Sequence, residues 1–249
     1  MHTQRLSNGL KGLARLGKVG AGSLLNGFLN PGCAVCDRPV SANISQSFCL
    51  DCHRQIQQQI RQTVYQQATS AADPFSIAAV GAYDGPLKRA ILALKYENRP
   101  DVAQFLGVAL AKSWLATAPH QQAQRTYVLP IPLHQDRWRQ RGYNQAALLA
   151  RAFCQTSGMA LLETGLVRSK ATVPQHQLGM EARQQNLQGV FEAGPSLRKL
   201  QGRLSRQGRP FNVVIVDDIY TTGVTVQSAA KVLTDTGIAV IGVAAVARA

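Results

Sequence analysis

The chain has 249 residues, of which 45% are hydrophobic and 6% aromatic, so it is long for one compact domain and short for two full ones. Its formal net charge is +14 at pH 7, a surplus larger than one small phosphorylated substrate needs. The charge therefore indicates affinity for polyanions such as nucleic acid, or else a generally basic solvated surface. No uninterrupted apolar stretch is long enough to cross a bilayer, which excludes an integral membrane segment.

Residues 1–30 form a basic segment for which the spacing predicts a helix. Leu6, Leu10, Leu13 and Leu16 recur at helical intervals between lysines and arginines. Docking on the protein's own surface is the commoner use of such a helix, and an anionic membrane surface is the alternative. The basic N-terminal segment is similar to a secretory signal peptide, but no clean cleavage site follows it. We therefore expect a cytoplasmic protein.

Residues 31–67 are predicted to form a zinc-binding module. Two Cys-x-x-Cys pairs, with twelve residues between them, supply four thiolates for a tetrahedral ion. Disulfides are the alternative, but a reducing cytoplasm disfavours them. His53 is a competing ligand, although Cys52 fits its pair better. The predicted ligands of a structural Zn²⁺ are Cys33, Cys36, Cys49 and Cys52.

Residues 75–249 show the pattern of an α/β domain, after a polar linker at 68–74. Segments rich in β-branched residues alternate with helical periods, which predicts a mostly parallel sheet in a three-layer arrangement. The stretch 168–210 is polar and is predicted to be irregular. Strands are expected at 75–83, 127–131, 213–216 and 238–246, and helices from 86, at 101–117, at 144–155 and at 225–236.

Two adjacent carboxylates, Asp217 and Asp218, follow the buried strand expected at 213–216. In open α/β sheets, ligands lie beyond the carboxyl ends of the strands. Neighbouring carboxylates there accept hydrogen bonds from vicinal hydroxyls, such as those of a ribose. Because they repel each other, they also favour a cation or a donor-rich ligand.

The five residues from Thr221 to Thr225 have the chemistry of a phosphate site. Threonine hydroxyls donate hydrogen bonds, Gly223 permits close backbone approach, and the helix that follows offers unpaired amides. Helix capping and a simple turn are the alternatives for each half of the pattern, but the whole order favours a ribose 5-phosphate. The predicted phosphate-binding residues are Thr221, Thr222, Gly223, Val224 and Thr225.

A basic segment at 134–142 follows the strand expected at 127–131. It carries Arg137, Arg139 and Arg141, and the planar fork of arginine suits phosphate. The alternate spacing would place the three side chains on one side of an extended segment. An exposed basic loop without a ligand is the alternative.

The pattern at 213–225 resembles the phosphoribosyl-diphosphate fingerprint of type I phosphoribosyltransferases. More closely, residues 75–249 resemble the ComF family, whose members join a zinc module to such a domain. The resemblance rests on Ala93–Tyr96, Pro130–His134, Arg137, Arg139, Arg141–Gln145, Gln175, Leu178, Arg183, Asn186 and Ala247–Arg248.

The resemblance implies a type I phosphoribosyltransferase fold that binds phosphoribosyl diphosphate with Mg²⁺. In such enzymes, pyrophosphate is displaced at C1 of the ribose, and Asp217 and Asp218 take the catalytic positions. The basic segment occupies the place of the pyrophosphate-binding loop, and its His134 is the weakest candidate there. Arg168 and Arg183 lie where related transferases carry a lid that closes over the diphosphate.

Two functions remain open at this point. The first is transfer of the phosphoribosyl group to an unknown acceptor. The second is a non-catalytic accessory protein that binds single-stranded DNA and retains the site. The resemblance implies a link to DNA uptake in natural transformation, with other competence proteins as partners. The low aromatic content, 6%, argues against an extensive base-stacking platform.

Overall fold

The computed structural model describes residues 31–40, 47–64, 75–117, 125–169 and 189–249. The chain divides into two compact units, Met1–Arg54 and Gln55–Ala249. The helix predicted over residues 1–30 lies outside the described residues, as do Arg183 and the rest of 170–188.

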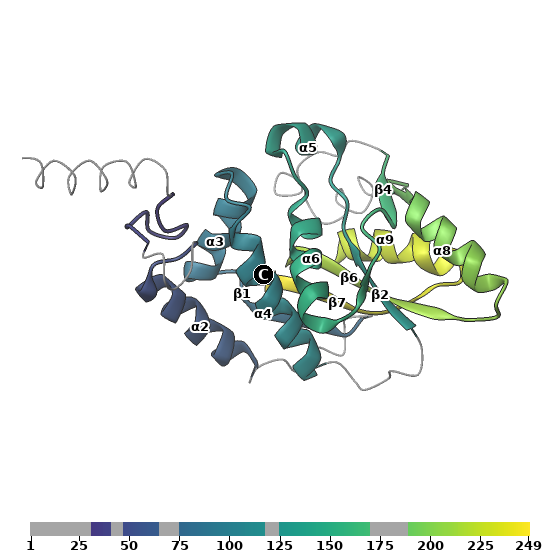
Figure 1. Cartoon of the computed structure of the whole chain (residues 1–249), viewed down its shortest axis with the longest axis horizontal. Helices are drawn as coiled ribbons and strands as arrows, with labels where there is room; N and C mark the ends of the chain where they lie inside the picture. The colour runs from purple at the N-terminus through teal and green to yellow at the C-terminus, as the bar shows by residue number, and fades with distance from the viewer. Residues whose placement is uncertain (1–30, 41–46, 65–74, 118–124, 170–188) are drawn as a thin grey trace, which may run out of the picture. The chain divides into compact units, whose positions relative to one another are not determined.

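A five-stranded sheet forms the centre of the second unit (Figure 1). Its strand order is β1-β7-β6-β2-β3, and every neighbouring pair is parallel. The central strand is buried from Phe211 to Val216, as expected for a parallel sheet covered on both faces. The strands are β1 (Ile77–Ala82), β2 (Arg125–Pro130), β3 (Ala160–Leu161), β6 (Phe211–Tyr220) and β7 (Ala239–Arg248).

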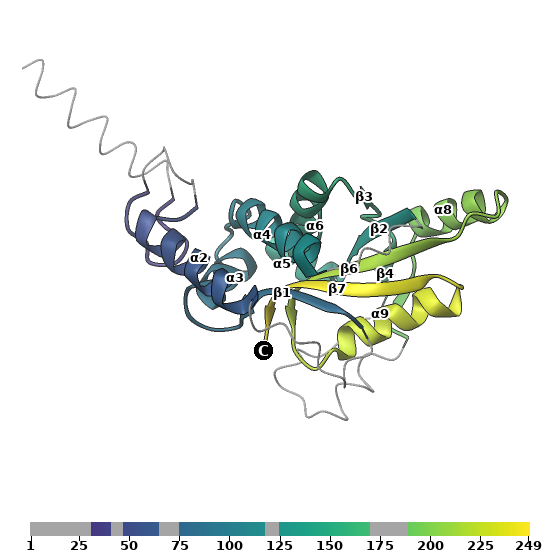
Figure 2. The ribbon, with the colours of Figure 1, turned by 90° about the horizontal axis from the view of Figure 1, so that it is seen from below.

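Helices cover both faces of this sheet, which confirms the predicted α/β class. Figure 2 shows α4 and α6 on one face and α9 on the other. Four helices of this unit are α3 (Gly85–Tyr96), α4 (Val102–Thr117), α6 (Gln145–Ser157) and α9 (Val224–Asp235).

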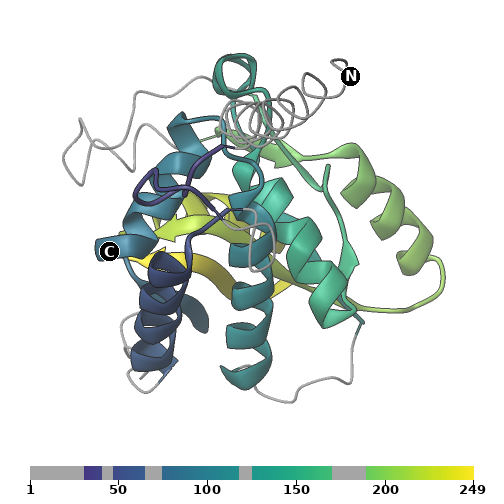
Figure 3. The same cartoon turned by 60° about the vertical axis from the view of Figure 1, so that its left-hand side comes forward.

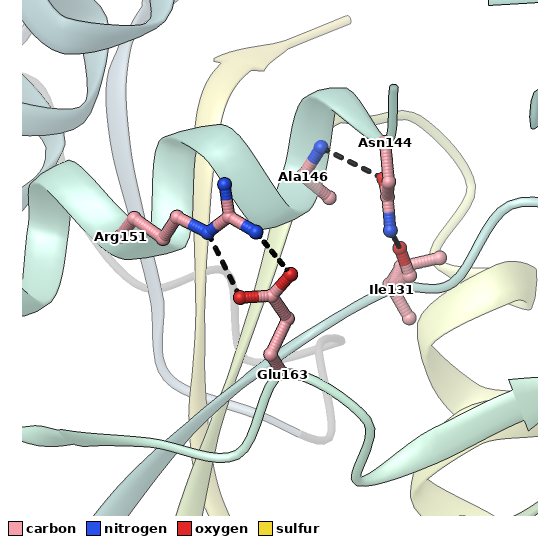
Figure 4. Close-up of polar contacts among 5 residues, drawn as sticks. All are labelled: Ile131, Asn144, Ala146, Arg151 and Glu163. Atoms are coloured by element: carbon pink, nitrogen blue, oxygen red, sulfur yellow. Dashed lines mark hydrogen bonds and ion pairs between the residues drawn. The ribbon is translucent and has the colours of Figure 1, made fainter. Parts of the chain in front are cut away.

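Helices α4 and α6 pack side by side on their face of the sheet (Figures 1 and 3). Their close approach requires Gly107, because a Cβ there would lie 2.6 Å from the Cβ of Ala152. Asn144 starts α6: its side chain accepts a hydrogen bond from the Ala146 amide at 3.0 Å and donates one to the Ile131 carbonyl at 3.0 Å. This second bond fixes α6 to the end of β2 (Figure 4).

A salt bridge also holds the middle of α6 (Figure 4). Arg151 donates from Nε to Glu163 at 2.8 Å, and a second nitrogen of the guanidinium also contacts the carboxylate. Paired contacts of this kind hold both side chains in one orientation.

Helix α2 spans Leu50–Val64, and its residues from Gln55 onward belong to the second unit. There, the Gln59 side chain donates to the Ala82 carbonyl at 3.1 Å and accepts from the Leu87 amide at 3.3 Å. One amide side chain therefore bridges the connection between β1 and α3.

The prediction that 168–210 is irregular is wrong for its described part beyond residue 188. Strand β4 (Leu166–Arg168) pairs antiparallel with β5 (Phe191–Ala193), and α8 (Pro195–Ser205) follows. Helix α8 buries Leu197, Leu200 and Leu204. These three leucines recur at helical spacing behind a proline at the first turn, so the signal was present within a highly basic sequence.

Candidate functional site

A cavity of about 460 Å³ opens beside the ends of β2 and β6 in the second unit. Its walls come from α3, the connection after β2, β4, β6 and the turn before α9. The sequence-predicted residues that line it are His134, Arg137, Arg141, Arg168, Asp217, Asp218, Thr221, Gly223 and Thr225. Thr222, Val224 and Arg139 are not among its lining residues.

The two aspartates lie within β6 and not beyond its end. The strand predicted to finish at Val216 continues to Tyr220, because Asp217 and Ile219 still pair with β7. The amide of Asp218 donates to Asp217 Oδ1 at 2.8 Å. Both residues line the cavity from a paired strand, so their backbone is held by the sheet.

Asp218 meets a buried cation from another element. Lys95, near the end of α3, places Nζ 2.9 Å from Asp218 Oδ1, and the two side chains are 16% and 5% exposed. Burial works to lower the pKa of Lys95, but the Asp218 carboxylate outweighs burial and raises it. The solvent-facing position that is usual for a lysine at a helix end is therefore not found here.

The second carboxylate oxygen of Asp218 is buried and has no hydrogen-bond partner among the described residues. Buried polar atoms are almost always satisfied, because an unpaired one costs free energy. A ligand hydroxyl or a divalent cation in the cavity would satisfy this oxygen, and carboxylate oxygens are the ligands that Mg²⁺ prefers.

Asp217 differs from its neighbour in its proton affinity. Burial, with the charge of Asp218 as the second cause, raises the pKa of Asp217 to about 7, although Lys95 and Arg168 oppose the change. Near neutral pH the Asp217 carboxyl group is therefore partly protonated.

The turn between β6 and α9 depends on Gly223. Its φ is +74°, and a Cβ there would lie 2.4 Å from the Tyr220 hydroxyl oxygen. Glycine thus satisfies both the left-handed backbone and the close contact. The amide of Gln227 bonds to the Gly223 carbonyl at 2.8 Å and begins the helix. Thr221, just before α9, and Thr225, in its first turn, therefore both line the cavity.

The basic segment after β2 is a helix, α5 (Gln135–Arg141), and not an extended loop. A helical period places Arg137 and Arg141 on one side and Arg139 on the other. Arg139 is 72% exposed and pairs with Asp136 at 3.6 Å. The prediction that all three arginines share one side is therefore wrong. His134 caps this helix by accepting from the Asp136 amide at 3.3 Å.

The four cysteines of the predicted module form one cluster. The Sγ atoms of Cys33, Cys36, Cys49 and Cys52 all lie within 4.8 Å of one another, and His53 is not in this group. Cys36 and Cys49 are 3.7 Å apart, and a tetrahedron of sulfurs at zinc-ligand distance has edges of about 3.8 Å. The cluster confirms a group of four cysteines that can hold a metal ion, with a geometry that suits zinc.

A neighbouring arginine favours the thiolate that a metal requires. Arg38 donates to Cys36 Sγ at 3.4 Å, and this contact lowers the pKa of Cys36 to about 6. Arg38 also pairs with Asp51 at 3.1 Å in the first turn of α2. The two cysteine pairs are thus joined by a polar bridge as well as by their sulfurs.

Among the residues that the structure describes, no helix combines the length and the apolar character that a bilayer crossing demands.

Comparison with known proteins identifies the family. No protein-family model matches the chain. "Competence protein F" of Haemophilus influenzae is 31% identical over 174 residues, which cover 68% of this chain and 71% of that protein. The chain belongs to the ComF family.

Further relatives agree with this assignment. The "DNA utilization protein YhgH" of Escherichia coli (strain K12) is 31% identical over 172 residues, covering 67% of this ComF chain and 69% of that protein. "Competence protein ComFC" of Bacillus subtilis (strain 168) is 24% identical over 206 residues, covering 82% and 72%.

The aromatic side chains around the cavity of this ComF protein were not predicted from the sequence. Tyr83, Tyr96 and Tyr220 line it from three separate elements, so no local motif joins them. The guanidinium of Arg141 lies 5.6 Å from the centre of the Tyr96 ring. Tyr96 stands within the Ala93–Tyr96 segment that supports the family resemblance, which is the one signal that pointed to it.

Proposed function

We propose that the cavity binds phosphoribosyl diphosphate together with Mg²⁺. The observation that carries this proposal is the buried Asp218 oxygen without a partner among the described residues, on a residue that lines the same cavity as Thr221, Gly223 and Thr225. In this arrangement the ribose hydroxyls donate to Asp217 and Asp218. The 5-phosphate accepts from the threonine hydroxyls and from the amides at the start of α9.

Three arginines support a diphosphate as the second anionic group. Arg137, Arg141 and Arg168 line the same cavity, and burial lowers the pKa of Arg141 and of Arg168. Cations that have lost part of their solvation gain from a nearby polyanion. Mg²⁺, when bound, would neutralise the diphosphate and offer coordination to the carboxylate oxygens.

The residues of this chain would contribute orientation and charge. The ion pair with Lys95 holds the Asp218 carboxyl group in place, where it would accept a hydrogen bond from a ribose hydroxyl. The arginines stabilise the negative charge that develops on a departing diphosphate, which is electrostatic catalysis by preorganised groups. We propose phosphoribosyl transfer to an acceptor as the reaction of this site. The alternative is a site that binds the donor without transferring it.

We further propose a role in DNA uptake or use, since relatives carry the names "Competence protein F" and "DNA utilization protein". Helix α8 supports single-stranded DNA binding as a second candidate function. Lys199 and Arg203 are exposed on it, four residues apart, and no ion pair with an acidic group involves either among the described residues. Like charges at this spacing weaken a helix unless an anion compensates them.

Calorimetric titration of phosphoribosyl diphosphate with Mg²⁺ tests the first proposal. Asp218→Asn removes a charged acceptor, so we expect affinity to fall by about 10- to 150-fold. Asp235→Asn is the matched control, because Asp235 is exposed and pairs with Lys231 on α9. Unchanged affinity in Asp218→Asn would refute the site. Pyrophosphate release with candidate acceptors then separates an enzyme from a binding protein.

A further inference from the structure

Helix α4 is apolar on two opposite sides. One side, with Leu106 and Leu110, is fully buried, and the helix packs on β1 and α6. The opposite side carries Phe105, Val108 and Ala109, which recur at helical intervals and are only partly buried. A helix that is apolar all round normally lies in the interior of a protein. The second side of α4 is therefore suited to contact with another protein surface.

A groove of about 290 Å³ lies along this second side. Its other wall is the part of α2 that belongs to the second unit. None of its lining residues lines the cavity of the proposed sugar-phosphate site, so the two are separate. We call it the α2–α4 groove, and the residues that matter for its chemistry are Ile60, Arg61, Phe105, Val108, Ala109 and Lys112.

Two cations border the apolar side chains of the groove. Arg61 and Lys112 are exposed, and neither pairs with an acidic group among the described residues. Helix α4 has no acidic residue, and α2 has none beyond Asp51. Stable interfaces match a positive border with a negative partner. The groove therefore suits a segment that combines apolar side chains with carboxylates.

The chain itself does not supply such a segment. Outside the described residues its sequence has two acidic residues, Asp73 and Glu181, and its leucine-rich residues 1–30 have none. A second copy is also a poor occupant, because two chains that each carry a net charge of +14 repel each other. The charge of the groove thus points to a different, acidic protein.

We propose that the α2–α4 groove binds an acidic amphipathic helix of a partner protein. In this mode of recognition, apolar side chains at i, i+3, i+4 and i+7 of the helix enter a hydrophobic groove. Here they contact Val108 and Ala109, while carboxylates beside them pair with Arg61 and Lys112. The interaction goes beyond the proposed function, because it uses no residue of the cavity and no nucleic acid.

Selection from a displayed library of helical peptides tests which chemistry the groove takes. The library varies every surface position and is first depleted on the double variant Arg61→Glu, Lys112→Glu. This step removes peptides that bind the general positive charge of the chain. Selection on the full native chain should then enrich peptides in which acidic residues flank an apolar stripe.

Fluorescence anisotropy of one selected peptide then measures each contribution. The double variant should bind at least about 10-fold more weakly, because like charges now meet. Val108→Gln should bind about 5- to 150-fold more weakly, because it sets a polar group against apolar side chains. Two controls should bind like the native chain. Lys231→Glu reverses an exposed charge on α9, and Leu115→Gln changes an exposed apolar residue of α4 that does not line the groove.

The proposal is overturned if selection enriches no peptide, or if the enriched peptides lack acidic residues. It is also overturned if the double variant or Val108→Gln binds the peptide as tightly as the native chain, with circular dichroism showing both variants folded. Displacement of the peptide by oligothymidine would assign the groove to nucleic acid. A native dimer that dissociates in the double variant would assign it to a second copy, and either result refutes an acidic partner.

Discussion

The cysteine cluster and the cavity are built in opposite ways. All four sulfurs come from residues 33–52, from two short turns and the start of α2. The cavity takes Lys95 from α3, Arg141 from α5, Arg168 from β4 and Asp218 from β6. The first site is local in sequence, and the second exists only because a parallel sheet brings distant strand ends together.

This difference indicates what stabilises each site. Short turns of the kind around the cysteines bury little apolar surface, so a bound metal must supply much of their folding free energy. The cavity instead rests on a covered sheet whose central strand is buried. Damage to one site should therefore leave the other intact. The first of four predictions tests that separation, and the other three measure what stabilises the second unit.

Removal of the metal should have the largest effect. Cys52→Ser leaves three thiolates, and structural zinc contributes roughly 10–16 kcal/mol to small zinc modules. We expect zinc content to drop and amide exchange to rise across residues 47–53, while residues of β6 stay protected. Cys154→Ser, outside the cluster, should keep its metal. Equal loss of protection in β6 would break the comparison.

Loss of Lys95 should be the largest effect in the second unit. Lys95→Met leaves Asp218 as a buried charge without its cation, and such a break costs about 3–5 kcal/mol in unfolding free energy. Urea unfolding of Lys95→Met, of Asp218→Asn and of the double variant measures the coupling. We expect the double variant to recover part of the loss. Lys231→Met, which breaks an exposed pair, should cost about 0.5 kcal/mol or less.

Asp217 should make stability depend on pH with a definite sign. Its pKa is raised to about 7 in the folded chain, mainly by burial, so the folded state binds more protons than the unfolded state between about pH 4 and 7. The unfolding free energy should therefore fall as pH rises through this window, by at most about 4 kcal/mol. Asp217→Asn should lose this dependence. A variant with the same pH profile as the native chain would contradict the assignment.

Two glycine substitutions should have the smallest effects, with opposite signs. Gly223→Ala places a Cβ at a φ of +74° and against Tyr220, so we expect a loss of about 1–3 kcal/mol. Gly202→Ala on α8 meets no atom within 4 Å and should gain about 0.5–1 kcal/mol through helix propensity. Thermal unfolding of both variants measures the contrast. Equal effects would show that the turn does not constrain Gly223.

Several features could be predicted from neighbouring residues alone. The spacing of two cysteine pairs predicted that the four cysteines lie together. The alternation of apolar patterns predicted the parallel sheet. The order of strand, paired acids and threonine-rich turn predicted which groups would lie near one another. That Asp217, Asp218 and Thr221 to Thr225 bind a ribose phosphate stays a prediction.

Other features escaped the sequence because they depend on residues far apart in the chain. β6 extends past Asp217 because β7 continues to pair with it, and strand pairing leaves no signal within one strand. The segment at 135–141 is helical although none of its residues is buried. Its sequence therefore lacks the apolar periodicity from which a helix is predicted. The helix changes which arginines face the cavity.

The sequence by itself determined the fold class through local periodicity, the group of four cysteines through their spacing, and the family through resemblance. Tertiary structure alone decided the pairing of Lys95 with Asp218, the raised pKa of Asp217 and the meeting of Tyr96 with Arg141. The physical reason is that burial and charge act through space. A proton affinity or a ring contact is set by whichever residues the sheet brings within a few ångströms.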